Sequence, residues 1–245
     1  MHLQFVGCGD AFGSGGRLNT CFHLVGDRTN LLIDCGASSL IGLKRLGIDR
    51  NAIDLILVTH FHADHFGGIP FFILDAQFFA KRARPLVIAG PSGLVDWYRR
   101  AMETAFPGSS GARRTFEVSL VELRPAEPWS FGAVSVLPAL VRHGHPEGPF
   151  HAYRITAEGR TVAYTGDTEW SEALVGIGRD ADLFIAEAYS YDRKRPLHLD
   201  YATLAAQLPR IAPRRLMLTH MDEGMLARRA GLPHEAAEDG LIVQL

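Results

Sequence analysis

The sequence predicts an α/β protein built as a four-layer αββα sandwich, in which two mixed sheets pack face to face and helices cover them. Two observations predict this class. Short apolar runs precede helix-like segments in the first half of the chain, and the same succession returns in the second half. The stretch from Phe106 to Arg114 is rich in glycine and serine and separates the halves like a loop. We interpret residues 1–245 as a single domain.

The elements follow from apolar runs punctuated by glycine and polar turn residues. In the first half we expect strands at His2–Val6, Cys21–Val25, Asn30–Ile33, Leu55–Val58 and Leu86–Ala89, and helices at Ala37–Leu46, Phe66–Arg82 and Leu94–Ala105. The first three strands form an antiparallel meander. In the second half we expect strands at Glu117–Leu123, Ala133–Val141, His151–Thr156, Thr161–Thr165, Asp182–Ala186 and Arg215–Thr219, and helices at Ser171–Ile177 and Tyr201–Leu208.

Composition excludes several classes of protein. Of the 245 residues, 47% are hydrophobic and 21% are charged, which is typical of a globular protein and not of a disordered chain. Three cysteines without a CxxC pair favour a reducing compartment, and we expect a cytoplasmic protein without a membrane segment. A net charge of −2 argues against a broad basic surface for nucleic acid, so any phosphate recognition is expected to be local.

The segment from Thr59 to His65 carries three imidazoles and a carboxylate directly after an expected strand. On an extended strand end, His60 and His62 point the same way and can share one metal ion. Asp64 and His65 then lie on the turn into a helix, where they can face a second metal ion. Two divalent cations about 3.5–4 Å apart are a known arrangement for hydrolysis.

Three further candidate ligands stand at the ends of other expected strands, namely His143, Asp167 and His220. His145 and His151 are alternatives to His143, and Asp167 would serve equally as a turn former or helix N-cap. We interpret the other histidines, His2, His23 and His234, as structural or surface residues. Imidazole with carboxylate suits Zn²⁺, with Mn²⁺ or iron as alternatives.

In this order of motifs the sequence resembles the metallo-β-lactamase superfamily. The resemblance covers nearly the whole chain and implies an αββα sandwich with a two-metal site at one edge. It implies that one metal is held by His60, His62 and His143, the other by Asp64, His65 and His220, with Asp167 bridging both. True β-lactamases commonly have Cys in place of Asp167, so the chain looks like the hydrolase branches with two equivalent zinc positions.

A finer resemblance points to the ribonuclease Z branch. Its marks are Glu187, the segment His198-Leu199-Asp200, the opening Val6 to Phe12 with Arg17-Leu18-Asn19-Thr20, and His143-x-x-Pro146 running into Tyr153-Arg154-Ile155. The branch usually has His-Ser-Thr where this chain has His198-Leu199-Asp200. It also usually has a long tRNA-gripping arm where this chain has only Thr156 to Arg160. The His-x-Asp form and the C-terminal Gly231 to Gly240 look more like the small phosphodiesterase of phosphonate-utilisation clusters, whose Cys-rich zinc site has no counterpart here.

The function expected from these features is a binuclear-zinc phosphodiesterase that cleaves a small or cyclic phosphodiester or a short RNA. A hydroxide held between the metals would attack, because coordination lowers the pKa of water from 15.7 to roughly 7. Asp64 would orient or deprotonate the water, and His198 would protonate or hydrogen-bond the departing oxygen while Glu187 fixes its tautomer. The alternatives are a lactonase or thioesterase, a tRNA 3′-processing endonuclease, disfavoured without the arm, and an idle binding module or di-iron redox protein. A homodimer is compatible with the sequence.

Overall fold

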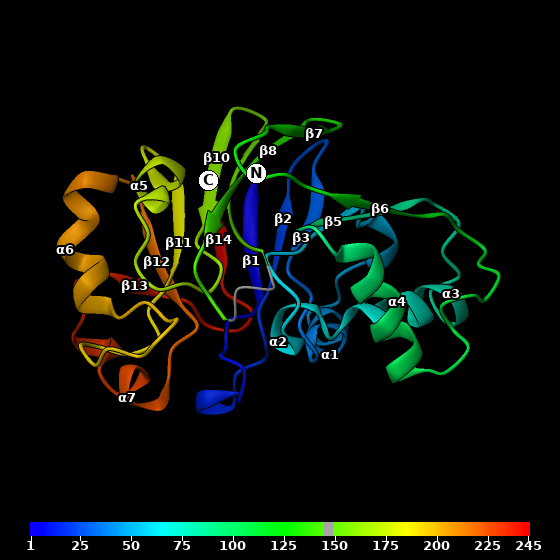
Figure 1. Cartoon of the computed structure of the whole chain (residues 1–245), viewed down its shortest axis with the longest axis horizontal. Helices are drawn as coiled ribbons and strands as arrows, with labels where there is room; N and C mark the ends of the chain where they lie inside the picture. The colour runs from blue at the N-terminus through cyan, green and yellow to red at the C-terminus, as the bar shows by residue number, and fades with distance from the viewer. Residues whose placement is uncertain (145–148) are drawn as a thin grey trace.

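The computed structural model describes residues 1–144 and 149–245, and its strands form two sheets of seven (Figure 1). The first sheet runs, edge to edge, through β14 (Ile242–Gln244), β1 (His2–Gly7), β2 (Cys21–Val25), β3 (Asn30–Ile33), β4 (Leu55–Leu57), β5 (Leu86–Gly90) and β6 (Val118–Glu122). The second runs through β13 (Glu235–Ala236), β12 (Leu216–Thr219), β11 (Leu183–Glu187), β10 (Arg160–Tyr164), β9 (Phe150–Ala157), β8 (Val134–Val141) and β7 (Trp129–Phe131).

Helices cover the outer faces of both sheets. Those of the N-terminal half are α1 (Ser39–Arg45) and α2 (Ala63–Phe66), in the lower middle of Figure 1, and α3 (Ile69–Phe78) and α4 (Leu94–Ala105), on its right. Those of the C-terminal half, on the left, are α5 (Ala173–Gly178), α6 (Tyr201–Ile211) and α7 (Glu223–Leu226). Three 3₁₀ turns are described at Ser14–Gly16, Arg50–Ala52 and Arg229–Gly231.

Three apolar layers hold this arrangement together. The central layer lies between the sheets and joins side chains such as Phe5 and Phe22 of the first sheet to Tyr164 and Ile185 of the second. The outer layers pack the first sheet against α3 and α4, and the second sheet against α5 and α6. The predicted four-layer αββα sandwich is confirmed.

The long helix expected at Phe66–Arg82 is wrong. The structure has two helices instead, α2 and α3, with Gly67 and Gly68 between them. Gly68 donates its N–H to Cys35 O at 2.9 Å, and a Cβ on Gly68 would lie 2.2 Å from Gly36 O. This close approach to the chain after β3 breaks the helix, and Pro70 in the first turn of α3 then starts the second one.

Very short strands escaped the sequence pattern, because two or three residues carry no readable alternation. These are β7, β13 and β14, of which β14 pairs with β1 and so closes the first sheet with the end of the chain. The antiparallel meander of β1, β2 and β3 is confirmed. Between β9 and β10, Glu158 and Gly159 form a two-residue turn with φ of 52° and 77°, so that no arm is inserted there.

Candidate active site

The chemistry-bearing side chains follow the carboxyl ends of strands. β4 is followed by His60, β8 by His143, β10 by Asp167 and β12 by His220, and Glu187 is the last residue of β11. In the second sheet, β10, β11 and β12 are mutually parallel, and β8 runs the same way because two antiparallel pairings separate it from β10. Their ends therefore meet at one edge of the sandwich, where open α/β sheets commonly bind ligands.

The first group of candidate metal ligands consists of His60, His62 and His143, each of which offers one ring nitrogen within 4.8 Å of the others. His62 Nδ1 lies 3.1 Å from His143 Nε2. The rings of His60 and His62 are 4.6 Å apart between centroids, and those of His60 and His143 are 5.0 Å apart. The ring nitrogens of His60 and His62 converge, but both residues lie in the loop after β4 and not on the extended strand end that the sequence predicted.

The second group consists of Asp64, His65, Asp167 and His220, all buried. Asp64 Oδ2 is 3.2 Å from Nε2 of both His65 and His220. Asp64 and His65 belong to the single turn of α2, as predicted for the turn into a helix. His220 has φ of 56°, a left-handed backbone, and its N–H donates to Cys8 O at 3.2 Å, which ties the end of β12 to the first sheet.

Asp167 lies between the two groups. Its Oδ1 is 3.3 Å from His65 Nε2, and its Oδ2 is 3.2 Å from His220 Nε2 and 3.7 Å from His143 Nε2. Burial alone would raise the pKa of this carboxyl, but His220 and His65 outweigh burial and hold the pKa well below its usual value. Asp167 is therefore an anion in contact with both groups, the position that the resemblance implies for a bridging ligand.

The imidazoles and carboxylates of this cluster shift each other's pKa values strongly. Burial lowers the pKa of His220, but Asp167, Asp64 and Glu187 outweigh it and raise the pKa to about 10. Burial and the neighbouring His65 lower the pKa of His60 well below its usual value. The carboxylates thus favour positive charge in the second group. A bound metal cation supplies this charge in place of protons on the imidazoles.

The donor set also accounts for buried polar atoms that lack hydrogen-bond partners. Among the described residues, His60 Nε2, His65 Nε2 and Asp167 Oδ1 are buried without an aligned partner. A buried polar atom left unpaired costs about 1–3 kcal/mol. These three atoms belong to the two converging groups, so imidazole nitrogen and carboxylate oxygen are presented as a divalent cation requires them. The residues present fit a metal centre.

Sequence reasoning missed the residues that orient these ligands. His65 Nδ1 donates to Asp34 Oδ2 at 2.7 Å, and Thr59 donates its N–H at 2.7 Å and its hydroxyl at 2.8 Å to the same carboxylate. His143 Nδ1 donates to Leu197 O at 2.8 Å. Such outer partners fix the tautomer of a ligand imidazole. Asp34 directly follows the expected strand Asn30–Ile33, so the strand-end signal that singled out Asp167 was present for it too.

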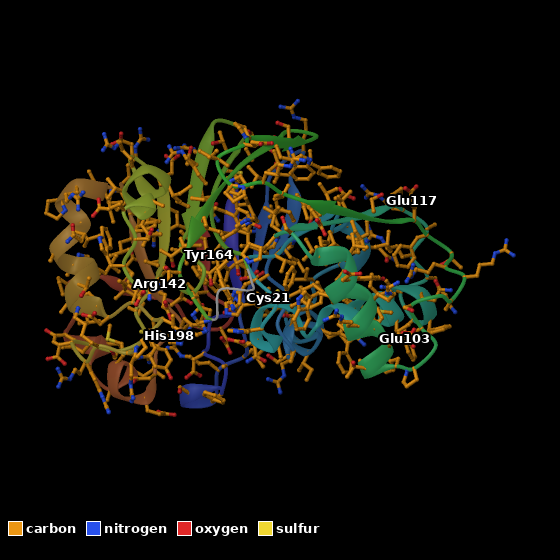
Figure 2. The ribbon with its side chains drawn as sticks, viewed as in Figure 1. Cys21, Glu103, Glu117, Arg142, Tyr164 and His198 are labelled. Atoms are coloured by element: carbon orange, nitrogen blue, oxygen red, sulfur yellow. The ribbon has the colours of Figure 1, made fainter. Side chains whose placement is uncertain are left out.

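Glu187 and His198 form a third cluster that touches the second group. Glu187 is fully buried, and its Oε1 contacts His198 Nδ1 and lies 3.5 Å from His220 Nδ1. Its Oε2 accepts the N–H groups of Thr168 at 2.9 Å and Leu199 at 3.1 Å. Burial lowers the pKa of His198, but the contact with Glu187 outweighs it and raises the pKa. Figure 2 labels His198 near the lower edge of the C-terminal half.

His198 is held on two further sides. Its ring stacks on Tyr189 with centroids 4.4 Å apart and an interplanar angle of 24°, and it meets the ring of His143 at 4.8 Å. Asp200, the third residue of the segment His198-Leu199-Asp200, lies outside the cluster and caps α6 by accepting the N–H of Thr203 at 2.9 Å.

The remaining histidines lie apart from these groups. His151, an alternative to His143, contacts the Tyr153 hydroxyl at 3.3 Å, and burial lowers the pKa of His151 to about 4. His23 pairs with Asn30 and His234 with Tyr201, each at 2.8 Å. The other alternative, His145, and Pro146 of the resemblance lie outside the described residues. No helix in the described ranges combines the length and the apolar character needed to cross a membrane.

Comparisons with known proteins agree with this geometry. Ribonuclease Z of Geobacillus kaustophilus (strain HTA426) is 28% identical over 276 aligned residues, covering 90% of this chain and 88% of the relative. The metallo-beta-lactamase fold protein YhfI from Bacillus subtilis superposes with a TM-score of 0.80 at 19% identity, covering 99% of both chains. Zn²⁺-bound PqqB from Methylobacterium extorquens superposes with a TM-score of 0.76 at 14% identity, covering all of both chains.

The predicted assignment to the metallo-β-lactamase superfamily, in its ribonuclease Z-like hydrolase branch, is confirmed. The sequence motifs did not single out one family within that branch. The model of the family described as "Anti-Pycsar protein Apyc1" matches residues 1–243, nearly the full length. The chain belongs to this family.

Proposed function

We propose that the protein is a phosphodiesterase with two divalent cations, Zn²⁺ in the first place, acting on a small or cyclic phosphodiester or a short RNA. The observation that carries the proposal is the contact of the Glu187–His198 pair with a set of candidate ligands that converge from both sheets. The pair adds a proton donor to a site that otherwise holds only candidate ligands and the groups that orient them.

His60, His62 and His143 would hold one cation, and Asp64, His65 and His220 the other, with Asp167 shared. Such cations lower the pKa of water and stabilise the charge that develops on the phosphoryl group. The ligand rings are locked from outside by Asp34, Thr59 and the Leu197 carbonyl, so they need little reorganisation to bind.

The protein's own groups would manage the two protons of the reaction. Asp64, with its carboxylate facing His65 and His220, would orient the attacking water and take up its proton. His198 has its Nδ1 committed to Glu187, which leaves Nε2 as the atom that can protonate the departing oxygen. Contact with Glu187 raises the pKa of His198, which favours the protonated form of its imidazole.

The lack of an inserted arm between β9 and β10, both in the described part of the chain, supports a small substrate. The turn at Glu158–Gly159 stands where ribonuclease Z carries its arm, and the 276-residue alignment is longer than this 245-residue chain, as expected from insertions in the relative. A net charge of −2 argues against a broad basic surface that would bind a folded RNA. The likeness to a protein named ribonuclease Z supports phosphodiester chemistry.

Elemental analysis of the purified protein, combined with a substrate screen, tests the proposal. We expect two divalent cations per chain and turnover of bis(p-nitrophenyl) phosphate and cyclic nucleotides, with little turnover of lactones or thioesters. Cleavage confined to lactones or thioesters would replace the phosphodiesterase by the lactonase alternative. A metal-loaded protein that cleaves no diester would remove the proposed function.

A further inference from the structure

A cavity of about 470 Å³ opens beside His198, on the side of the second sheet. Trp170, Lys194 and Arg195 line it together with His198. His198 also belongs to the cluster with Asp167, Glu187 and His220, so the cavity and the candidate metal ligands share this residue. A group seated in this cavity is therefore next to the imidazole of His198.

Most charges around the cavity are already paired within the protein. Lys194 Nζ lies 2.7 Å from Asp200 Oδ2, and Glu169 Oε1 lies 2.7 Å from Arg142 Nε. Arg195 differs from them. Among the described residues no carboxylate lies within 4 Å of its guanidinium, and its Nε is buried without a hydrogen-bond partner. The described residues thus leave the buried Nε–H of this cationic group without an acceptor.

Trp170 gives the cavity an aromatic wall. The side chain is half-buried and packs against the apolar layer outside the second sheet. Its Nε1 donates to Glu172 Oε1 at 3.1 Å, which occupies the single polar atom of the ring and fixes its edge. The rest of the ring is apolar, and stacking on such a ring binds nucleobases in proteins without base-specific hydrogen bonds.

The direction of the reaction relates this cavity to the substrate. In the proposed hydrolysis, the bond between phosphorus and the leaving oxygen breaks, the oxygen of water takes its place on phosphorus, and His198 gives a proton to the departing oxygen. The leaving part of the substrate must lie within reach of His198 Nε2. The cavity shares His198 with the site, so it is placed to receive that part.

Resting on the proposed function, we propose that this cavity is the leaving-group subsite and that it takes a nucleoside. Trp170 stacks on the base, and Arg195 donates to an acceptor atom of the base or ribose. Lys194, already paired with Asp200, holds the loop before α6 and contributes little to binding. In a cyclic nucleotide the nucleoside remains attached to the phosphate after cleavage, so a nucleoside monophosphate would occupy the cavity and the candidate metal centre together.

Calorimetric titration of the zinc-loaded full chain tests the subsite with two probes that share a phosphate. Adenosine 5′-monophosphate carries a base, and ribose 5-phosphate does not. We expect the nucleotide to bind about tenfold more tightly, since stacking of one base on an aromatic ring contributes of that order. Trp170→Leu should abolish this preference and Trp170→Phe should restore most of it. Arg195→Gln should weaken nucleotide binding severalfold, whereas Arg193→Gln, which removes the same charge outside the cavity, should leave it unchanged.

The outcomes separate the subsite from the catalytic proposal. Equal affinity of the wild-type protein for both probes, or a preference that survives in Trp170→Leu, would overturn the subsite. If a variant fails to show the wild-type melting temperature, the decision passes to the conservative pair Arg195→Gln and Arg193→Gln. A base preference that depends on Trp170 in a protein without diesterase activity would support the subsite and contradict the proposed function. Diester cleavage without any base preference would support the proposed function and contradict the subsite.

Discussion

The two sheets contribute to the candidate metal centre in different ways. The first sheet supplies four ligands from one short stretch, His60 to His65, between β4 and the end of α2. The second sheet supplies three, His143, Asp167 and His220, from the ends of three strands that are far apart in the chain. The first set is nearly local, and the second exists only when the second sheet is folded and packed on the first.

The difference extends to what holds the ligands. Asp34 and Thr59, which follow strands β3 and β4 of the first sheet, hold His65 and His60 through a buried hydrogen-bond network. In the second sheet, His143 relies on the Leu197 carbonyl in the turn that also carries His198, and His220 relies on Cys8 of the first sheet. Leu197 has φ of 69°, a left-handed conformation that a leucine rarely adopts. The four ligands from His60 to His65, which we call the local half, are thus held by a buried network. The three ligands of the second sheet, which we call the distant half, depend in part on the turn that also carries the proposed proton donor, His198.

The largest effect is expected from removing a ligand of the local half. His62→Ala leaves His60 and His143 as an incomplete group, so we expect loss of bound metal and turnover at background level. Elemental analysis and diesterase assays measure both. His234→Ala removes a histidine that pairs with Tyr201 away from the site and should change neither. Full metal content in His62→Ala would contradict the proposed ligand set.

The second effect tests the proton-donating part of the distant half. His198→Ala should keep its metal and lose about 10²–10⁴ in kcat, the usual contribution of a general acid. The loss should be much smaller for bis(p-nitrophenyl) phosphate, because p-nitrophenolate departs without a proton, than for a diester with an alkyl leaving group. Equal losses for both substrates, or loss of metal, would assign His198 to phosphate binding or to ligand placement instead.

A third, smaller effect tests the buried network that holds the local half. Asp34→Asn keeps the size of the side chain but removes the charge that faces His65, so metal affinity should fall about 10–100-fold while activity returns at saturating zinc. Competition with a chelator measures the affinity. Asp75→Asn is the matched control, because Asp75 is a buried aspartate in α3 whose carboxylate pairs with Lys44 and Arg50, and its metal affinity should equal that of the wild type. Unchanged affinity in Asp34→Asn would show that Thr59 and packing suffice.

How much of this could be predicted from sequence follows from the same contrast. The dense motif around His62 is readable because four ligands fall within six positions, and the strand ends suggested Asp167 and His220. The partners of those ligands are not readable, since Leu197 acts through its carbonyl, which any residue would supply. The break between α2 and α3 depends on how closely Gly68 approaches Gly36, and only the packed structure shows this contact.

The smallest effect concerns acid stability in the local half. Asp75 lies in α3, and its carboxylate is 2.6 Å from Lys44 Nζ and 2.7 Å from Arg50 Nε. Burial raises the pKa of Asp75, but the hydrogen bonds from Lys44 and Arg50 outweigh burial and hold the pKa below its usual value. A lowered pKa stabilises the fold above the unfolded-state value, about 3.9, and this contribution disappears as the pH falls through the folded-state pKa.

Asp75→Asn should therefore lower the free energy of unfolding by about 1 kcal/mol at pH 7, as expected for charged hydrogen bonds to partly exposed partners. The deficit relative to the wild type should shrink below pH 4, where the wild-type carboxylate itself becomes protonated. Urea unfolding at both pH values measures the difference. A deficit that stays constant with pH would show that Asp75 stabilises α3 through packing alone, and the first sheet would then hold its ligand-bearing loop without this ion pair.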